Sequence, residues 1–282
     1  MVTGYNRESD ERGVSESIGF LIIFSIVIAG IGLVTLYGYP TLMQRQVGAE
    51  ETIMEKNMIV LQNDIKSLAY KTVPYKETAL KIGGGSLTVY NSSYSPPVSA
   101  ITITVNGTTY INSFKPGELR YESVSAQTDI SLQNGAVVLR PRISQTTTNG
   151  SVMLAEPRWF YDVNPVSNKG TIVLNLINIT SDSMMAKEGI GTVRMRLVRE
   201  PEPYYNYTAN INRIDIDYIP IGQDYSLAWD NYITKTFDQQ PGLSFISSGT
   251  PGTGSQLSYT LSPSGSNLDL VIKIFEVEIE SI

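Results

Sequence analysis

The sequence predicts an α+β protein in which a long N-terminal helix is followed by a mainly antiparallel, β-sandwich-like body. The helix is indicated by an uncharged apolar run from Ile18 to Tyr39 and by apolar residues that then recur at helical spacing as far as Leu68. The body is indicated by apolar residues that alternate with polar ones from about Ser86 onward, the pattern of half-buried strands. We therefore expect a helical segment over residues 14–73 and a β-rich domain over residues 83–282.

Composition narrows the chemistry that this chain can perform. Its 282 residues carry a formal net charge of −6 and include neither cysteine nor histidine. The acidic balance argues against nucleic acid as a partner. The missing residue types exclude a Ser-His-Asp triad, a Cys-His pair and a histidine-ligated metal. Since the sequence also shows no recognisable glycosidase carboxylate pair and no EF-hand-type loop, we expect no enzyme activity, no metal and no cofactor.

The apolar run has the length of a membrane span. At ~1.5 Å per residue, a helix from Ile18 to Tyr39 covers about 30 Å, the thickness of the hydrocarbon core. The run is too long for a secretory signal peptide, and no small-residue cleavage site follows it. We therefore expect a retained membrane helix that packs on other helices, because small residues allow close approach in an apolar medium. The small residues expected at this packing face are Gly19, Ser25, Ala29 and Gly32.

The residues around the start of the run resemble a processing signal. The segment ERGVSESIG, Glu11 to Gly19, is similar to the start of archaeal type IV pilin-like proteins, whose leader ends in a basic residue and Gly or Ala. The resemblance implies that residues 1–13 are a leader and that a prepilin-type peptidase cuts between Gly13 and Val14. The segment departs from the family pattern in two ways, because the leader is not net basic and Ile18 stands where an acid is usual.

Glu16 is then the acid nearest to the new N-terminus. The resemblance implies that it pairs with the freed amine of Val14 on a neighbouring subunit, since a charge near hydrocarbon is costly unless it is paired. The alternatives are an ordinary interfacial residue or an acid that is favoured by the helix dipole.

An amphipathic helix is expected over residues 41–70, continuing the apolar helix. Its apolar stripe packs either on the body of its own chain or on neighbouring helices. Pro40 is expected to kink or interrupt the helix, and Gly83 to Gly85 are expected to form a joint or turn. The stripe consists of Met54, Met58, Leu61, Ile65 and Leu68.

The body is expected to contain several hairpins and one helix. Asn-Gly pairs at Asn106, Asn134 and Asn149 favour type I′ turns between strands. Ser226 is expected to cap a helix from Leu227 to Phe237. The last stretch, Asn267 to Ile282, predicts a central strand with a bulge near Ile274, because its apolar phase slips there.

Five asparagines begin an N-x-S/T sequon and are candidate glycosylation sites. Asn178 falls inside an apparent strand, whereas the other four asparagines fall in apparent turns or loops. The five asparagines are Asn91, Asn106, Asn149, Asn178 and Asn206.

Asp215 and Asp217 share a strand face, which does not by itself make a metal site.

These features lead to two hypotheses. The first is a type IV pilin-like cell-surface subunit, major or minor, that assembles with like subunits through its N-terminal helix and exposes a glycosylated body. The alternative is a singly membrane-anchored surface protein whose β-rich domain binds a ligand or an envelope partner without polymerising. We expect the protein in the cell membrane with an extracellular domain or, under the first hypothesis, in a surface filament. Under both, its expected partners are the membrane and a prepilin-type peptidase.

Overall fold

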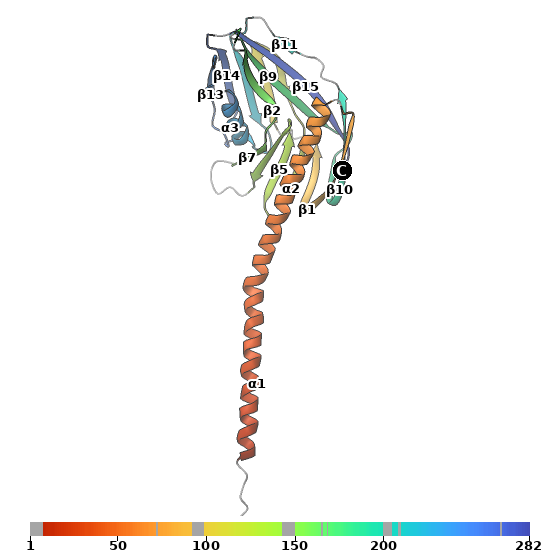
Figure 1. The fold of residues 1–282 in the computed structure, drawn as a ribbon, viewed down its shortest axis with the longest axis vertical. Coiled ribbons are helices and arrows are strands. Elements are labelled where there is room, and N and C mark those ends of the chain that lie inside the picture. The colour runs from red at the N-terminus through yellow and green to blue at the C-terminus, as the bar shows by residue number, and fades with distance from the viewer. Residues whose placement is uncertain are drawn as a thin grey trace, which may run out of the picture. The chain divides into compact units, whose positions relative to one another are not determined.

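The α+β class is confirmed by a computed structural model, which describes residues 8–71, 73–91, 99–142, 150–164, 166–167, 169–199, 205–207, 210–265 and 267–282. The chain divides into two compact units, Met1–Ala49 and Glu50–Ile282. Helix comes first in the chain, and strands make up most of the second unit (Figure 1).

The N-terminal part of the chain is helical without a break. Helix α1 (Glu8–Leu33) leads into a π-helical turn η1 (Val34–Gly38) and then into α2 (Tyr39–Tyr70). The expected interruption at Pro40 is therefore replaced by a change of helix type one turn earlier. Proline has no N–H to donate and its ring crowds the preceding turn, and a π-turn is a known way to absorb such a fault within a helix.

The apolar stripe of α2 packs on the body of its own chain, which settles the alternative that the sequence left open. The stripe residues are fully buried and share one core with strands of the large sheet. Gln62 lies beside them, and its side chain donates to the backbone oxygens of Gly135 at 2.7 Å and Glu156 at 2.9 Å. Figure 1 shows α2 lying across a face of this sheet.

The large sheet has ten strands in the order β7-β6-β5-β4-β1-β10-β15-β9-β8, and β11 also pairs with β15. All its pairs are antiparallel except β9 with β15. Its strands are β1 (Tyr75–Tyr90), β4 (Glu118–Ser123), β5 (Thr128–Gln133), β6 (Ala136–Pro141), β7 (Val152–Ala155), β8 (Trp159–Asn164), β9 (Lys169–Thr180), β10 (Met185–Arg199), β11 (Tyr205–Tyr207) and β15 (Asn267–Ser281).

The three consecutive glycines lie inside β1 and do not form the joint or turn expected from the sequence. They form an irregularity at which pairing with β10 shifts register, between Ile82 and Leu87. Gly84 has φ +66°, and a Cβ on Gly85 would lie 2.2 Å from the backbone oxygen of Glu122. Glycine is therefore required here by close strand approach and by a left-handed conformation.

β15 is central, as expected, but the bulge near Ile274 is absent. Its parallel pairing with β9 runs without a shift from Asn267 to Glu278, and the irregularities toward β10 fall nearer its end. The apolar phase changes because the strand exchanges its buried face. Leu268, Leu270 and Ile272 face one core, whereas Phe275, Val277 and Ile279 face the other.

A five-stranded antiparallel sheet and one helix build the second core. The sheet has the order β13-β14-β12-β2-β3. Helix α3 (Ser226–Phe237) buries Trp229, Ile233 and Phe237, the face predicted from the sequence. The predicted cap is wrong, because the Ser226 side chain accepts a hydrogen bond from the Gly252 N–H, while Asp224 accepts from the Ser226 N–H. The strands are β2 (Ser99–Val105), β3 (Thr108–Phe114), β12 (Ile214–Pro220), β13 (Leu243–Ser248) and β14 (Leu257–Pro263).

Two of the three predicted Asn-Gly turns are confirmed. They join β2 to β3 and β5 to β6, and all four residues have φ between +46° and +81°. Type I′ turns require positive φ at both central residues, and Asn and Gly tolerate it. The third turn includes Asn149, which lies outside the described residues.

Candidate functional site

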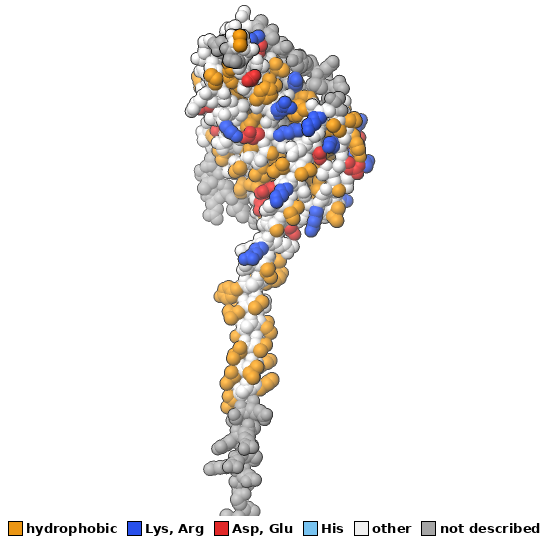
Figure 2. All heavy atoms as spheres, viewed as in Figure 1, with side chains coloured by type: hydrophobic (Ala, Val, Ile, Leu, Met, Phe, Trp, Pro, Cys, Tyr) orange, Lys and Arg blue, Asp and Glu red, His pale blue; other side chains and the backbone are white. Residues whose placement is uncertain are grey.

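The first candidate site is the apolar surface of the N-terminal helix. From Ser17 onward the helix is long and apolar enough to cross a membrane, and its most apolar 18-residue window has a mean hydropathy of 2.7 with nothing buried. Figure 2 shows its apolar side chains exposed over successive turns. Exposed apolar surface of this extent is typical of a membrane or protein interface.

The small residues predicted for helix packing lie on this surface. Ser25 and Ala29 are exposed, and a Cβ built on Gly19 or Gly32 would meet nothing within 4 Å apart from the chain neighbours and the nearby backbone of the helix itself. The Ser25 hydroxyl donates to the Leu21 backbone oxygen at 2.7 Å, so its polarity is satisfied within the helix. The surface is therefore open to a close neighbour.

The residues predicted for processing and subunit pairing are within helix α1, but their side chains lie outside the described residues. These are Gly13, Val14 and Glu16.

The sequon asparagines occupy different settings. Asn106 is exposed in a turn, and its side chain bonds the backbone of Asn210, Asn212 and Arg213. Asn91 is half-buried and donates to the Ser181 backbone oxygen at 2.8 Å. Asn178 lies within β9 and is half-buried. Asn149 and the side chain of Asn206 lie outside the described residues.

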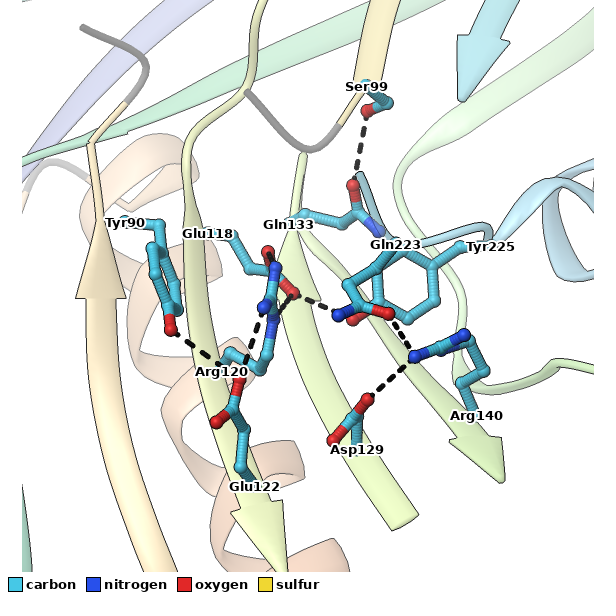
Figure 3. Close-up of polar contacts among 10 residues, drawn as sticks. All are labelled: Tyr90, Ser99, Glu118, Arg120, Glu122, Asp129, Gln133, Arg140, Gln223 and Tyr225. Carbon is cyan, nitrogen blue, oxygen red and sulfur yellow. Dashed lines mark hydrogen bonds and ion pairs between the residues drawn. The ribbon is translucent and has the colours of Figure 1, made fainter. Parts of the chain in front are cut away.

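The second candidate site is a buried polar cluster that sequence reasoning missed (Figure 3). It lies on the face of β4, β5 and β6 opposite to α2. Glu118 is fully buried, and Arg120, 8% exposed, donates to its two carboxylate oxygens at 2.9 and 2.6 Å. The Tyr225 hydroxyl donates to the same carboxylate at 2.9 Å. Arg120 also pairs with Glu122 at 3.2 Å and lies 4.4 Å from the centre of the Tyr90 ring.

A second ion group lies beside the first. Asp129 is 1% exposed and pairs with Arg140 at 3.0 Å and Arg142 at 3.2 Å. Arg140 also donates to Gln223, in the segment that precedes α3. These contacts connect the polar face of the large sheet to the segment leading into α3.

The electrostatics of the cluster follow from its burial. Burial opposes the charged guanidinium of Arg120, but the hydrogen bonds and charge of Glu118 raise its pKa above the usual value. Burial raises the pKa of Asp129 despite its two arginines. Burial, with the negative charge of Glu118, raises the pKa of Tyr225 well above its usual value. The cluster is fixed by paired charges and holds the polar face of the sheet to the α3 segment, a structural arrangement.

The remaining carboxylates do not gather into a potential metal site among the described residues. No group of three or more potential metal ligands comes together there. Asp215 accepts from Arg213 and Thr260, and Asp217 accepts from Ser258, so each is held by neighbouring residues of the sheet.

The fold and these sites define a class of protein: a β-rich body joined to one apolar helix of the kind that anchors proteins in membranes. The chain belongs to a family that is described as a family of unknown function, DUF7289, whose model matches residues 12–255. No curated protein and no solved structure matches the chain.

Proposed function

We propose that this protein is a type IV pilin-like cell-surface subunit that assembles through its N-terminal helix. One observation carries the proposal: the helical backbone that begins as an exposed apolar segment continues into the buried stripe of α2. One element then serves both as a membrane helix and as part of the body's core. Together with the leader-like sequence at Gly13 and Val14, this supports a subunit that is processed at the membrane, with its body, glycosylated at exposed sequons, outside the cell.

The alternative, a singly anchored surface protein, is favoured by a different observation. The apolar stripe of α2 is buried in the core of its own body. Contacts between helices of different subunits therefore depend on the apolar segment that precedes it. A protein of this kind shares the membrane helix but not the filament.

The processing step gives the first test. We expect the protein extracted from membranes of the native host to begin at Val14, and its intact mass to lack residues 1–13. The variant Gly13→Trp should keep the leader, because the peptidase must accommodate a small residue at this position. A wild-type chain that retains Met1 contradicts the pilin-like leader.

The packing face gives the second test. The triple variant Ser25→Leu, Ala29→Leu and Gly32→Leu replaces small residues on one face, where bulk prevents close helix approach. We expect it to reach the membrane fraction like the wild type but to be missing from filaments sheared off the cells, as seen by electron microscopy.

A matched control keeps the same apolar character on the opposite face. Phe20→Leu, Ile23→Leu and Val27→Leu lie about half a turn away at ~100° per residue and should leave filaments intact. If the small-residue variant still enters filaments, the proposed packing face is wrong. If the wild type stays wholly in the membrane and no filament contains it, the anchored alternative replaces the subunit.

A further inference from the structure

A shallow groove lies on the body where α2 ends. It consists of two open hollows of about 320 and 470 Å³ that share Tyr70 and Arg158. The hollows are bordered by the last turns of α2, by the β7–β8 connection and by strands β8, β9 and β15. Pockets of several hundred Å³ are of the size that accepts small ligands.

Basic side chains line this groove in a protein that is acidic overall. Lys66, Lys71 and Arg158 border one hollow, and Arg158 and Lys273 border the other. Figure 2 shows Lys and Arg side chains gathered over this part of the body. The neighbouring carboxylate, Glu156, is directed to Lys235 at 2.6 Å. The groove therefore presents local positive charge.

The position of Arg158 is fixed by its surroundings. The side chain of Asn175, 4% exposed, donates to the Arg158 backbone oxygen at 2.5 Å. The Arg158 guanidinium lies 4.9 Å from the centre of the Tyr70 ring, and Tyr70 meets Phe275 edge to face at 5.2 Å. Among the described residues no ion pair is formed by the Arg158 or Lys71 side chain.

The positive charges in the groove repel one another. Lys66 donates to the Glu156 backbone oxygen at 2.9 Å, which holds its ammonium near Arg158. Burial, and then the positive charge of Arg158, lower the pKa of Lys66, and Glu156 offsets this only partly. A bound anion would relieve this repulsion.

The rest of the lining matches a sugar more closely than a phosphate. Phe160 exposes 38% of its surface beside the basic residues, and an aromatic ring offers an apolar face for the C–H groups of a sugar ring. Asn63 and Ser67 add an amide and a hydroxyl.

From this arrangement we propose that the groove binds an oligosaccharide that carries carboxylate groups, such as a uronic acid chain. Arg158 and the lysines hold the carboxylates, since a guanidinium matches a carboxylate with two parallel donors. Phe160 contacts a ring face, and the two connected open hollows accept successive sugar units.

The proposal is tested by titrating the full-length protein in detergent with oligogalacturonate and measuring binding by calorimetry. Fully methyl-esterified oligogalacturonate keeps the rings and removes the charge, whereas inorganic polyphosphate keeps charge and removes the rings. We expect the ester and the polyphosphate each to bind at least tenfold more weakly than the free acid.

Three variants locate the site. Arg158→Gln should weaken binding at least tenfold, and Phe160→Ala about fivefold without any change in charge. Lys187→Gln removes one exposed positive charge elsewhere on the body and should change binding less than twofold. Thermal unfolding of each variant confirms that the body is folded.

Each contrary outcome overturns a defined part of the proposal. Equal binding of polyphosphate, or equal losses in Arg158→Gln and Lys187→Gln, reduces the site to non-specific charge attraction. Full binding by Phe160→Ala removes the ring contact. No binding of the free acid rejects the carboxylated sugar as the ligand class.

Discussion

The body is expected to unfold cooperatively in alkali, within about one to three pH units above pH 10. Among the core tyrosines that are at most 4% exposed, four have strongly raised pKa values: Tyr218, Tyr225, Tyr232 and Tyr259. Burial raises the pKa of Tyr232 to about 12 and raises the pKa of each of the other three well above its usual value. Below the unfolded pKa of about 10, both states are protonated and the stability contributed by these groups is fully present.

Above that pH the unfolded chain releases these protons, while the folded body retains them. Each tyrosine then costs the folded state about 1.4 kcal/mol per pH unit until its own folded pKa is reached. Together the four amount to about 5–6 kcal/mol per pH unit, against a typical domain stability of about 5–15 kcal/mol.

Ultraviolet absorbance of tyrosinate and circular dichroism check this expectation in one titration. The chain has 17 tyrosines, so part of the absorbance change comes from the others. The part that comes from these four should coincide with the change in circular dichroism, because their hydroxyls ionise only on unfolding. Tyr218→Phe keeps the ring, which stacks on Trp229 at 5.8 Å, and should reduce the pH dependence by about 1.4 kcal/mol per pH unit. If the circular dichroism stays constant while all tyrosines ionise gradually, these four are not buried as described.

Breaking the buried ion group should be the most damaging single substitution in the body outside its apolar cores. Arg120→Met is expected to lower the free energy of unfolding by about 3–5 kcal/mol, because it leaves the fully buried carboxylate of Glu118 without its cation. Urea unfolding of the detergent-solubilised protein, followed by circular dichroism, measures the loss.

Two further variants separate the lost pair from the lost side chain. Arg194→Met removes an arginine whose pair with Glu77 is exposed on both sides and should cost far less stability than Arg120→Met, because water screens an exposed pair. Adding Glu118→Gln to Arg120→Met removes the unpaired charge and should restore part of the stability. If Arg120→Met lowers the free energy of unfolding by less than about 1 kcal/mol, water reaches the Glu118 carboxylate and the pair is not buried as described.

The local features of the fold are predictable because they rest on neighbouring residues. The Asn106-Gly107 and Asn134-Gly135 turns follow from residues that tolerate positive φ. The buried face of α3 follows from the spacing of Trp229, Ile233 and Phe237. Neither the turns nor the buried face of α3 depends on knowing which part of the chain packs against it.

The burial of the polar cluster was not predictable from the alternation of apolar and polar residues. Strand β5 alternates apolar and polar residues, the pattern of a strand with one face in water, yet all six of its residues are buried. Asp129, Ser131 and Gln133 face the side of the sheet opposite to α2 and lie beside residues from β4, β6 and the segment before α3. Periodicity reports that two faces differ in polarity, but it does not report that both are covered.

By itself the sequence determined the apolar helix, the stripe on α2, the hairpin turns and the predominance of strands, since each is set by spacing within one stretch of chain. The tertiary structure alone decided that the stripe packs on its own body, that β15 exchanges its buried face without a bulge, and that β9 and β15 run parallel. It also brought Lys66, Arg158 and Lys273 to one groove. These outcomes depend on contacts between residues far apart in the chain, and a local pattern records that a face is buried without recording what buries it.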